Sequence, residues 1–281
     1  MERNDSIVLS NGITMPPVVM STFGLDYTIM KPLVLEALDL GVRAFDTARK
    51  YGNEDVVGRV LAECLQERGL SRSDVFITTK IFTFQQAAGK IKEEADVSLR
   101  NLNTDYIDLW LIHWPCPEYY LNTWKQMSEV YLGGKVKSIG LANPQVRHLE
   151  TISREAPSVP LHCVQIELHP FRTCKDVVSW CNERGVAIQS YTPLCKMIPK
   201  VRDCEMLQIL AKRHSCTLAQ LILSWHFHKR FVPVFSTRKT ARVKENLLAF
   251  NVDLCDDEIQ AIDALNEDYK LLLESIYCPG Y

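Results

Sequence analysis

Short apolar runs alternate with longer segments of helical period along nearly the whole chain. The runs are almost continuously apolar, as in the stretch Tyr-Ile-Asp-Leu-Trp-Leu-Ile at residues 106–112, which is typical of a sheet covered on both faces. We therefore expect eight strands, at residues 18–23, 43–47, 75–80, 106–113, 137–141, 161–166, 187–191 and 231–235.

The segments between these runs carry the spacing of amphipathic helices. Apolar residues at positions 56, 57, 60, 61, 64 and 65 fall on one helical face, and Gly69 marks the end of that helix. The same spacing recurs at residues 124–131 before a Gly-Gly pair. It recurs again at residues 218–225 behind Thr217, a residue type that caps helix N-termini.

Strands that alternate with helices over about 250 residues predict an α/β fold, a (β/α)8 TIM barrel. A doubly wound open sheet shares this alternation, but no GxGxxG motif follows the first predicted strand, where the chain reads Val-Met-Ser-Thr-Phe-Gly at residues 19–24. Residues 7–15 predict a β-hairpin around Asn11-Gly12, and we expect it to cover the bottom of the barrel. No linker rich in Pro, Gly or Ser divides the chain, so we expect residues 1–281 to form a single domain.

Composition narrows the class of protein. The 281 residues are 47% hydrophobic and 23% charged with a formal net charge of -2, which indicates a globular protein without the basic field that nucleic-acid binding requires. We expect no membrane span, because no run of about 18 apolar residues occurs. The polar N-terminus predicts no secretory signal and hence a cytoplasmic location. The ten cysteines form no CxxC pair, so we expect reduced thiols and no metal site.

Four chemically capable residues follow consecutive predicted strands. Asp46 and Tyr51 come after the second strand, Lys80 ends the third, and His113 ends the fourth. Each residue alone has a structural explanation, such as a helix cap, a solvated strand end or a hydrogen-bonded core histidine. Because the C-terminal ends of barrel strands share one mouth, where barrel enzymes carry their active sites, the four together favour a catalytic site.

Further sequence blocks lie around and beyond these residues. Residues 45–54 read Phe-Asp-Thr-Ala-x-x-Tyr-Gly-Asn-Glu, residues 79–80 read Thr-Lys, and residues 112–115 read Ile-His-Trp-Pro. Downstream blocks are Gly-Lys-Val-Lys-Ser-Ile-Gly-Leu-Ala-Asn at 134–143, Val-Gln-Ile-Glu-Leu-His-Pro at 164–170, Ser-Tyr-Thr-Pro-Leu at 190–194 and Arg-Val-Lys-Glu-Asn at 242–246. In this order they resemble the motifs of the aldo-keto reductase family nearly end to end.

The resemblance implies reduction of a carbonyl to an alcohol by NAD(P)H. In that reaction Tyr51 is the proton donor, although a free phenol titrates near pKa ~10. The Lys80 ammonium is expected to lower the pKa of this phenol, and Asp46 to keep Lys80 charged and aligned. His113 is expected to donate a hydrogen bond to the substrate carbonyl.

The resemblance also implies a cofactor site with two departures from the family pattern. Ala142 stands where Ser is usual, and Ser236-Thr237 stands where Lys-Ser is common. Because Arg238 and Arg242 retain positive charge for a phosphate, NADP(H) is favoured, with NAD(H) as the alternative. The expected cofactor-binding residues are Thr22, Asp46, Asn143, Gln165, Tyr191, Thr192, Leu194, Ser236, Thr237, Arg238, Arg242, Glu245 and Asn246.

The substrate, a small carbonyl or alcohol, is expected to meet Phe23, Phe82 and Trp114 at the mouth. The short connection at residues 116–120 indicates an open cleft, unless Tyr119 and Tyr120 fold over it. In the C-terminal tail, Tyr277 or Tyr281 either closes the cleft or belongs to a frayed end.

Other functions share this pattern. A dedicated biosynthetic ketoreductase with a narrow substrate is one alternative. A cofactor-binding partner subunit, such as a potassium-channel β subunit, or a recruited lens structural protein is a non-enzymatic alternative. The complete set of Asp46, Tyr51, Lys80 and His113 favours an enzyme, and we expect a monomer or a weak homo-oligomer.

Overall fold

The computed structural model describes residues 6–273 and residue 278, and within them the strands form two sheets. The strands are β1 (Ile7–Val8), β2 (Thr14–Met15), β3 (Val19–Ser21), β4 (Ala44–Asp46), β5 (Phe76–Ile81), β6 (Leu109–Ile112), β7 (Ile139–Ala142), β8 (Cys163–Glu167), β9 (Ala187–Tyr191) and β10 (Val232–Phe235). The helices are α1 (Tyr27–Asp39), α2 (Glu54–Glu67), α3 (Thr83–Ala88), α4 (Ile91–Asn101), α5 (Tyr120–Leu132), α6 (Val146–Glu155), α7 (Lys175–Arg184), α8 (Pro199–Arg202), α9 (Glu205–Arg213), α10 (Leu218–His228), α11 (Thr240–Leu247) and α12 (Asp256–Asp263).

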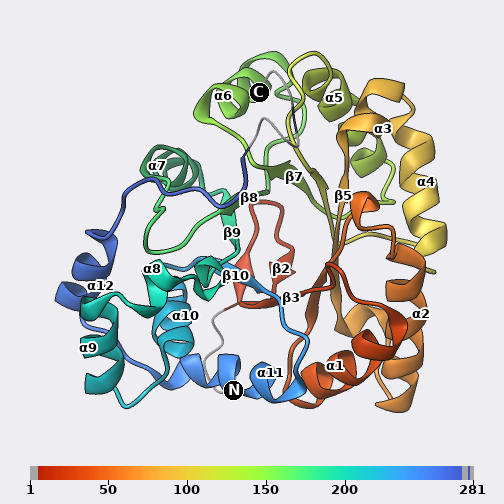
Figure 1. The fold of residues 1–281 in the computed structure, drawn as a ribbon. Helices are drawn as coiled ribbons and strands as arrows, with labels where there is room; N and C mark the ends of the chain where they lie inside the picture. Colours follow the sequence, from red (N-terminus) through yellow and green to blue (C-terminus); the bar gives the residue numbers. More distant parts are fainter. Residues whose placement is uncertain (1–5, 274–277, 279–281) are drawn as a thin grey trace.

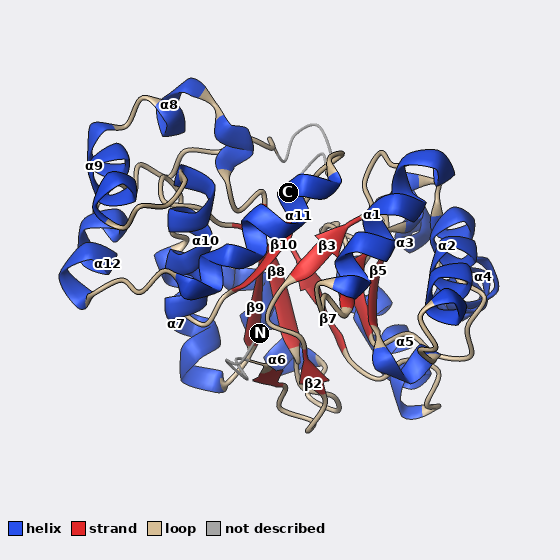
Figure 2. Cartoon of the chain, turned by 90° about the horizontal axis from the view of Figure 1, so that it is seen from below, coloured by secondary structure: helices blue, strands red, loops and turns tan. Residues whose placement is uncertain are grey.

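The larger sheet is a closed barrel with the order β10-β3-β4-β5-β6-β7-β8-β9, and its neighbouring strands pair in parallel. Helices lie outside the strands (Figures 1 and 2). This confirms the predicted (β/α)8 barrel, and each of the eight predicted runs overlaps one barrel strand. The apolar runs predicted the strands well because both faces of each strand are covered.

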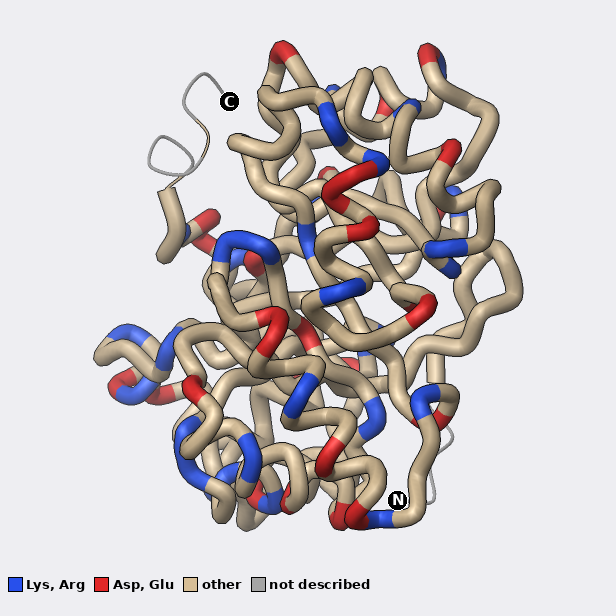
Figure 3. The backbone as a smooth tube through the Cα atoms, turned by 90° about the vertical axis from the view of Figure 1, so that its right-hand side faces the viewer, with Lys and Arg blue, Asp and Glu red and all other residues tan. Residues whose placement is uncertain are grey.

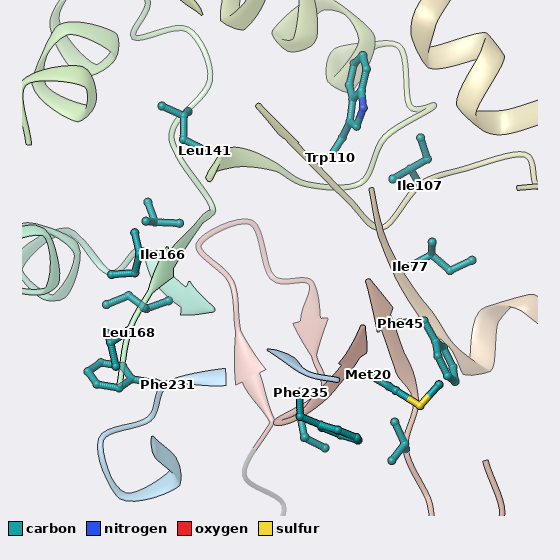
Figure 4. Packing of buried hydrophobic residues seen from close by; sticks show 14 of the residues in the cluster. Met20, Phe45, Ile77, Ile107, Trp110, Leu141, Ile166, Leu168, Phe231 and Phe235 are labelled. Carbon is teal, nitrogen blue, oxygen red and sulfur yellow. The ribbon is translucent and has the colours of Figure 1, made fainter. Parts of the chain in front are cut away.

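Successive residues of a barrel strand alternate between the barrel interior and the helical layer. Along β6, Leu109 and Leu111 belong to the interior cluster, while Trp110 and Ile112 pack in the outer cluster. Figure 4 shows outward-facing members such as Phe45, Ile77 and Trp110. The same period of two also points residues near the C-terminal ends of the strands into the barrel. There the inward side chains are polar instead of apolar, and they form the site described below.

The N-terminal hairpin closes the bottom of the barrel, as predicted. Leu9 and Met15 are almost fully buried and pack with interior side chains of the barrel strands. Asn11 in the turn donates a hydrogen bond to the carbonyl of Lys137, which precedes β7, at 2.8 Å. Gly12 has a φ of +83°, a left-handed value that glycine adopts without strain.

The structure differs from the predicted elements in two places. The strand predicted at residues 106–113 is shorter and spans Leu109–Ile112, with Ile107 forming an isolated bridge to Val136. The Arg72 guanidinium donates to the Tyr106 carbonyl and the Asp108 carboxylate in this segment. Between β9 and β10 the chain forms α8 and α9 in addition to the predicted helix α10. The N-cap predicted at Thr217 is confirmed, since its side chain accepts the backbone N–H of Gln220 at 3.2 Å.

Candidate active site

An ion pair between Asp46 and Lys80 lies at the top of the barrel interior. Lys80 Nζ is 2.6 Å from both carboxylate oxygens of Asp46 and 3.0 Å from the carbonyl oxygen of Thr47. Both side chains are almost fully buried. Burial lowers the pKa of Lys80, and the Asp46 charge opposes that shift. Removing Asp46 would therefore leave a buried ammonium without its counter-charge.

Asp46 is also held from the opposite side of the barrel. Gln165 on β8 donates through Nε2 to Asp46 Oδ2 at 2.9 Å and to Gln189 Oε1 at 2.7 Å. Gln189 in turn donates to the sulfur of Met15 in the hairpin. Since β4 and β8 lie opposite each other in the strand order, this chain of hydrogen bonds spans the interior and fixes the carboxylate that fixes Lys80.

Tyr51 reaches the same point from the loop after β4. Residues Arg49–Tyr51 form a 3-10 turn that ends at Gly52, whose φ of +65° favours glycine. The Tyr51 hydroxyl lies 3.5 Å from Lys80 Nζ, and the ammonium is 5.2 Å from the centre of the Tyr51 ring. The predicted meeting of Asp46, Lys80 and Tyr51 is therefore present in the structure.

The expected lowering of the Tyr51 pKa is wrong for this arrangement. Burial raises the pKa of Tyr51 well above its ordinary value, and the Asp46 carboxylate raises it further. The reason is that a buried phenolate loses its hydration, and this cost outweighs the attraction of the Lys80 ammonium 3.5 Å away. Tyr51 consequently stays protonated through the neutral range and keeps a proton available.

His113 completes the group at the end of β6. Its ring centre is 5.9 Å from that of Tyr51 and 5.5 Å from that of Phe82. Burial, followed by the ammonium charges of Lys80 and Lys50, holds the pKa of His113 well below its usual range. The imidazole is therefore neutral near pH 7 and carries one N–H, which it can donate to a carbonyl oxygen.

Two residues of the same sequence block support the site although the sequence suggested no role for them. Asn53 is buried, donates to the carbonyl of Thr22 at 2.9 Å and accepts from the Thr47 hydroxyl, which joins the loops after β3 and β4. Glu54 is buried as well and accepts from Thr79, which precedes Lys80, at 2.7 Å. Both side chains are polar and buried, and polar groups inside a protein need hydrogen-bond partners. Those partners are visible only in the folded structure.

The residues expected to hold a nicotinamide carboxamide come from three neighbouring strands: Asn143 follows β7, Gln165 lies on β8 and Tyr191 ends β9. Asn143 has a left-handed backbone with a φ of +58°, donates to the carbonyl of His113 at 2.9 Å, and accepts from the Tyr191 hydroxyl. Gln165 uses its amide nitrogen on Asp46 and Gln189, which leaves its amide oxygen as an acceptor. This donor and acceptor set, beside the half-buried ring of Tyr191, fits a carboxamide.

The residues expected near the adenosine phosphate follow β10. Ser236, Arg238 and Arg242 are exposed; Arg238 precedes α11 and Arg242 lies in its first turn. Arg238 donates to the carbonyl of Gly24 at 2.9 Å and so links this loop to the one after β3. The Thr237 hydroxyl is engaged by the backbone of Lys239. An exposed guanidinium in the first turn of a helix suits a phosphate, so Arg242 stays the expected phosphate partner.

The remaining expected cofactor residues lie on the same rim. The Thr22 hydroxyl donates to the carbonyl of Asp46 at 3.0 Å. Thr192 has a left-handed backbone, and among the described residues no hydrogen-bond partner reaches its buried hydroxyl. Leu194 packs on the core. In α11, Asn246 is buried, and Glu245 accepts through its backbone carbonyl from Gln220.

The three expected substrate residues differ in exposure and in their contacts with the Tyr51 and His113 rings. Phe23 is 63% exposed, and its ring lies 4.9 Å from that of Tyr51. Phe82 and Trp114 are buried and form a small apolar cluster with Cys278 and Cys116. The C-terminal tail thus reaches the mouth at Cys278, while Tyr277 and Tyr281 lie outside the described residues.

The sequence left open whether Tyr120 folds over the cleft. Tyr120 begins α5 and is buried, with its ring 5.2 Å from that of His148 on α6, so it packs between helices.

All ten cysteines are free. Within residues 6–273 and residue 278, no group of three or more His, Cys, Asp and Glu side chains could hold a metal ion. None of the described helices has the length and apolar character needed to cross a membrane.

Comparisons with known proteins agree with this geometry. A family model described as the aldo/keto reductase family matches residues 24–267. The glyoxal reductase of Bacillus subtilis is 33% identical, with 95% of each chain covered, and the methylglyoxal reductase DkgA of Escherichia coli O157:H7 is 32% identical, with 94% of each covered. Among solved structures, the Bombyx mori aldo-keto reductase in complex with NADP is 26% identical and superposes with a TM-score of 0.90, covering 97% of this chain and 96% of that one.

Proposed function

The chain belongs to the aldo/keto reductase family, and from that premise we propose that it reduces an aldehyde or ketone to an alcohol with NADPH, Tyr51 acting as the proton donor. Membership makes the chain an oxidoreductase. The observation that carries the finer proposal is the approach of the Tyr51 hydroxyl to Lys80 Nζ, with Lys80 itself bound by Asp46.

Each residue of the site has a distinct task in this proposal. When bound, the nicotinamide supplies the hydride that reduces the carbonyl carbon. His113, neutral and half-buried, donates its N–H to the carbonyl oxygen and sets its direction. Tyr51 donates its phenolic proton to the same oxygen as negative charge develops there. An alkoxide is a much stronger base than a phenolate, so this transfer is favourable even with a raised pKa at Tyr51.

Lys80 and Asp46 act on Tyr51 after the proton has left. A phenolate beside Lys80 gains a hydrogen-bonded cation, and the barrel interior keeps that pair out of water. Asp46 holds the ammonium in place during the whole cycle. The Tyr51 phenolate then takes a proton from solvent, which returns the side chain to its starting state.

Asn143, Gln165 and Tyr191 are proposed to hold the nicotinamide end of the cofactor, and Arg242 with the α11 N-terminus its phosphate end. The preference for NADPH is supported by the positive charge of Arg238 and Arg242 beside the exposed loop after β10. NADH remains the alternative cofactor, since the usual family lysine is replaced by Ser236.

The test is consumption of NADPH with a panel of aldehydes and ketones, including glyoxal and methylglyoxal because two relatives carry those names. We expect turnover that requires Tyr51. Absence of NADPH and NADH oxidation with every carbonyl, while the purified protein still binds cofactor, would refute the reductase and favour a cofactor-binding partner role. A narrow response to one large ketone would favour the dedicated ketoreductase.

A further inference from the structure

A cavity of about 660 Å³ lies beside the proposed catalytic site, on the part of the mouth formed after β6–β9. It begins at Trp114, Asn143 and Tyr191 and continues between the N-terminal ends of α6 and α7, with residues 266–272 among its walls. Tyr51 and Lys80 are not among its lining residues. The cavity is therefore an extension of the site, reached from the nicotinamide side.

Four cationic side chains line this extension. They are Arg147, Arg172, Lys175 and Lys270. The proposed phosphate contacts Arg238 and Arg242 follow β10, whereas Arg147 and Arg172 follow β7 and β8. The two basic regions thus belong to different strand ends, and the cations of the cavity are separate from those assigned to the cofactor.

Three carboxylates line the cavity together with the four cations. Glu167 accepts the backbone N–H groups of Leu271 at 2.6 Å and Leu272 at 3.0 Å and also contacts His169. Its carboxylate is therefore committed to holding the segment after α12 against β8. Asp176 and Asp268 are the other acidic lining residues, and both are exposed.

Arg172 has a guanidinium donor that no described residue satisfies. Its Nη1 donates to the carbonyl of Asp268 at 3.4 Å, and its buried Nε has no hydrogen-bond partner within the described part of the chain. After burial, the charge of Arg172 is the largest influence that lowers the pKa of Lys270. Arg172 and Lys270 thus repel each other, while Glu167 and Asp268 act on Lys270 in the opposite direction. An anion between the two cations would relieve their repulsion.

We propose that this cavity binds the anionic end of the carbonyl substrate, a carboxylate or a phosphate, with Arg172 as its principal partner. The proposal rests on the reductase function and names its substrate class: an aldehyde or ketone that carries a remote acidic group. The guanidinium fork suits both anions, and Trp114 provides an apolar surface for the chain between the carbonyl and the acid.

The experiment compares kcat/KM for matched substrates with NADPH. A series of ω-oxo carboxylates of increasing chain length is measured against the n-alkanals of the same lengths, and glyceraldehyde 3-phosphate against glyceraldehyde. We expect at least one acid to exceed its neutral partner by about tenfold or more, the range of a hydrogen bond to a charged group. The two arms separate carboxylate from phosphate recognition.

Two variants assign the preference to the cavity. Arg172→Met should abolish the preference for the acid while changing kcat/KM for the neutral aldehyde less than about twofold. Arg100→Met, on the exposed face of α4, removes the same charge elsewhere and should keep the preference. Ratios below tenfold for every pair, a preference that survives Arg172→Met, or an equal loss with both substrates would overturn the proposal.

A binding measurement separates this proposal from the reductase function. Calorimetric titration of the NADP-loaded protein uses n-alkanoates, which cannot be reduced, and n-alkanols of equal length. Binding of the alkanoate alone, lost in Arg172→Met, supports the anion site even if no carbonyl is turned over. Equal or absent binding of both series, together with unselective turnover of aldehydes, refutes the anion site and leaves the reductase intact.

Discussion

The edge of the barrel mouth after β4–β6 and the edge after β10 hold their polar side chains in different ways. After β4–β6, Asp46 and Lys80 are almost fully buried and bonded to each other at 2.6 Å. After β10, Ser236 and Arg242 are exposed, and Arg238 reaches one carbonyl oxygen of a neighbouring loop. Our proposal places the chemistry at the first edge and recognition of the cofactor phosphate at the second.

The difference teaches how much each residue should matter. A buried polar group has its position fixed by partners, and its loss leaves those partners unsatisfied. An exposed cation is screened by water and salt and can be replaced in part by its neighbours. Effects of substitution should therefore fall from the first edge to the second. Figure 3 shows acidic and basic residues interspersed along the chain. The contrast between the two edges therefore comes from the residues of each edge and not from an uneven distribution of charge along the chain.

Tyr51→Phe should have the largest effect because it removes the proposed acid and keeps the ring. We expect kcat for aldehyde reduction to fall by roughly 10³-fold, the range of general acid catalysis, with the Kd for NADPH changed less than about twofold. Tyr131→Phe, at a half-buried tyrosine on α5, is the matched control and should keep wild-type turnover. Comparable kcat values for Tyr51→Phe and the wild type would remove Tyr51 from the acid role.

Asp46→Asn should have the next largest effect, and on stability as well as turnover. It leaves Lys80 buried without a counter-charge, so the free energy of unfolding should fall by about 3 kcal/mol in urea titrations. The double variant Asp46→Asn with Lys80→Met should recover more than half of that loss and remain inactive. If the double variant were no more stable than the single one, the ion pair would not be the source of the loss.

His148 tests whether burial also controls the pH response near the mouth. Burial and then Arg147 lower its pKa to about 4, and its Nδ1 accepts the backbone N–H of Gln145. The unfolded chain, with an ordinary histidine pKa near 6.5, binds more protons below that pH, so stability falls on acidification. From pH 7 to pH 5 this group should cost about 2 kcal/mol of unfolding free energy.

His148→Gln retains an acceptor for Gln145 and cannot titrate. Urea unfolding at pH 7 and pH 5 should therefore show a smaller loss in this variant than in the wild type. Equal losses in both proteins would assign the acid sensitivity to other groups and would remove His148 from the comparison.

Sequence reasoning succeeded for features set by a local pattern or by strand order, and it failed for contacts between residues far apart in the chain. The strands were predictable because an apolar run is visible in the residues of the strand itself. The meeting of Asp46, Tyr51, Lys80 and His113 was predictable because the C-terminal ends of parallel barrel strands share one mouth. The hydrogen bond from Gln165 to Asp46 joins residues 119 positions apart across the barrel, and no local pattern encodes it. The direction of the Tyr51 pKa depends first on burial and then on the Asp46 charge, and the burial is known only from the folded structure.

The exposed edge after β10 should yield the smallest effect and the clearest specificity. Arg242→Ala should raise the Kd for NADPH by about tenfold, or about 1.4 kcal/mol, and leave the Kd for NADH within about twofold. The loss should shrink as salt rises, because an exposed contact is screened, whereas the Tyr51→Phe defect should be independent of salt. Equal Kd values for the two cofactors in the wild-type protein would refute phosphate recognition at this edge. A salt-independent loss in Arg242→Ala would instead mean that the phosphate contact is buried on binding, and the contrast between the two edges would then hold only for the free protein.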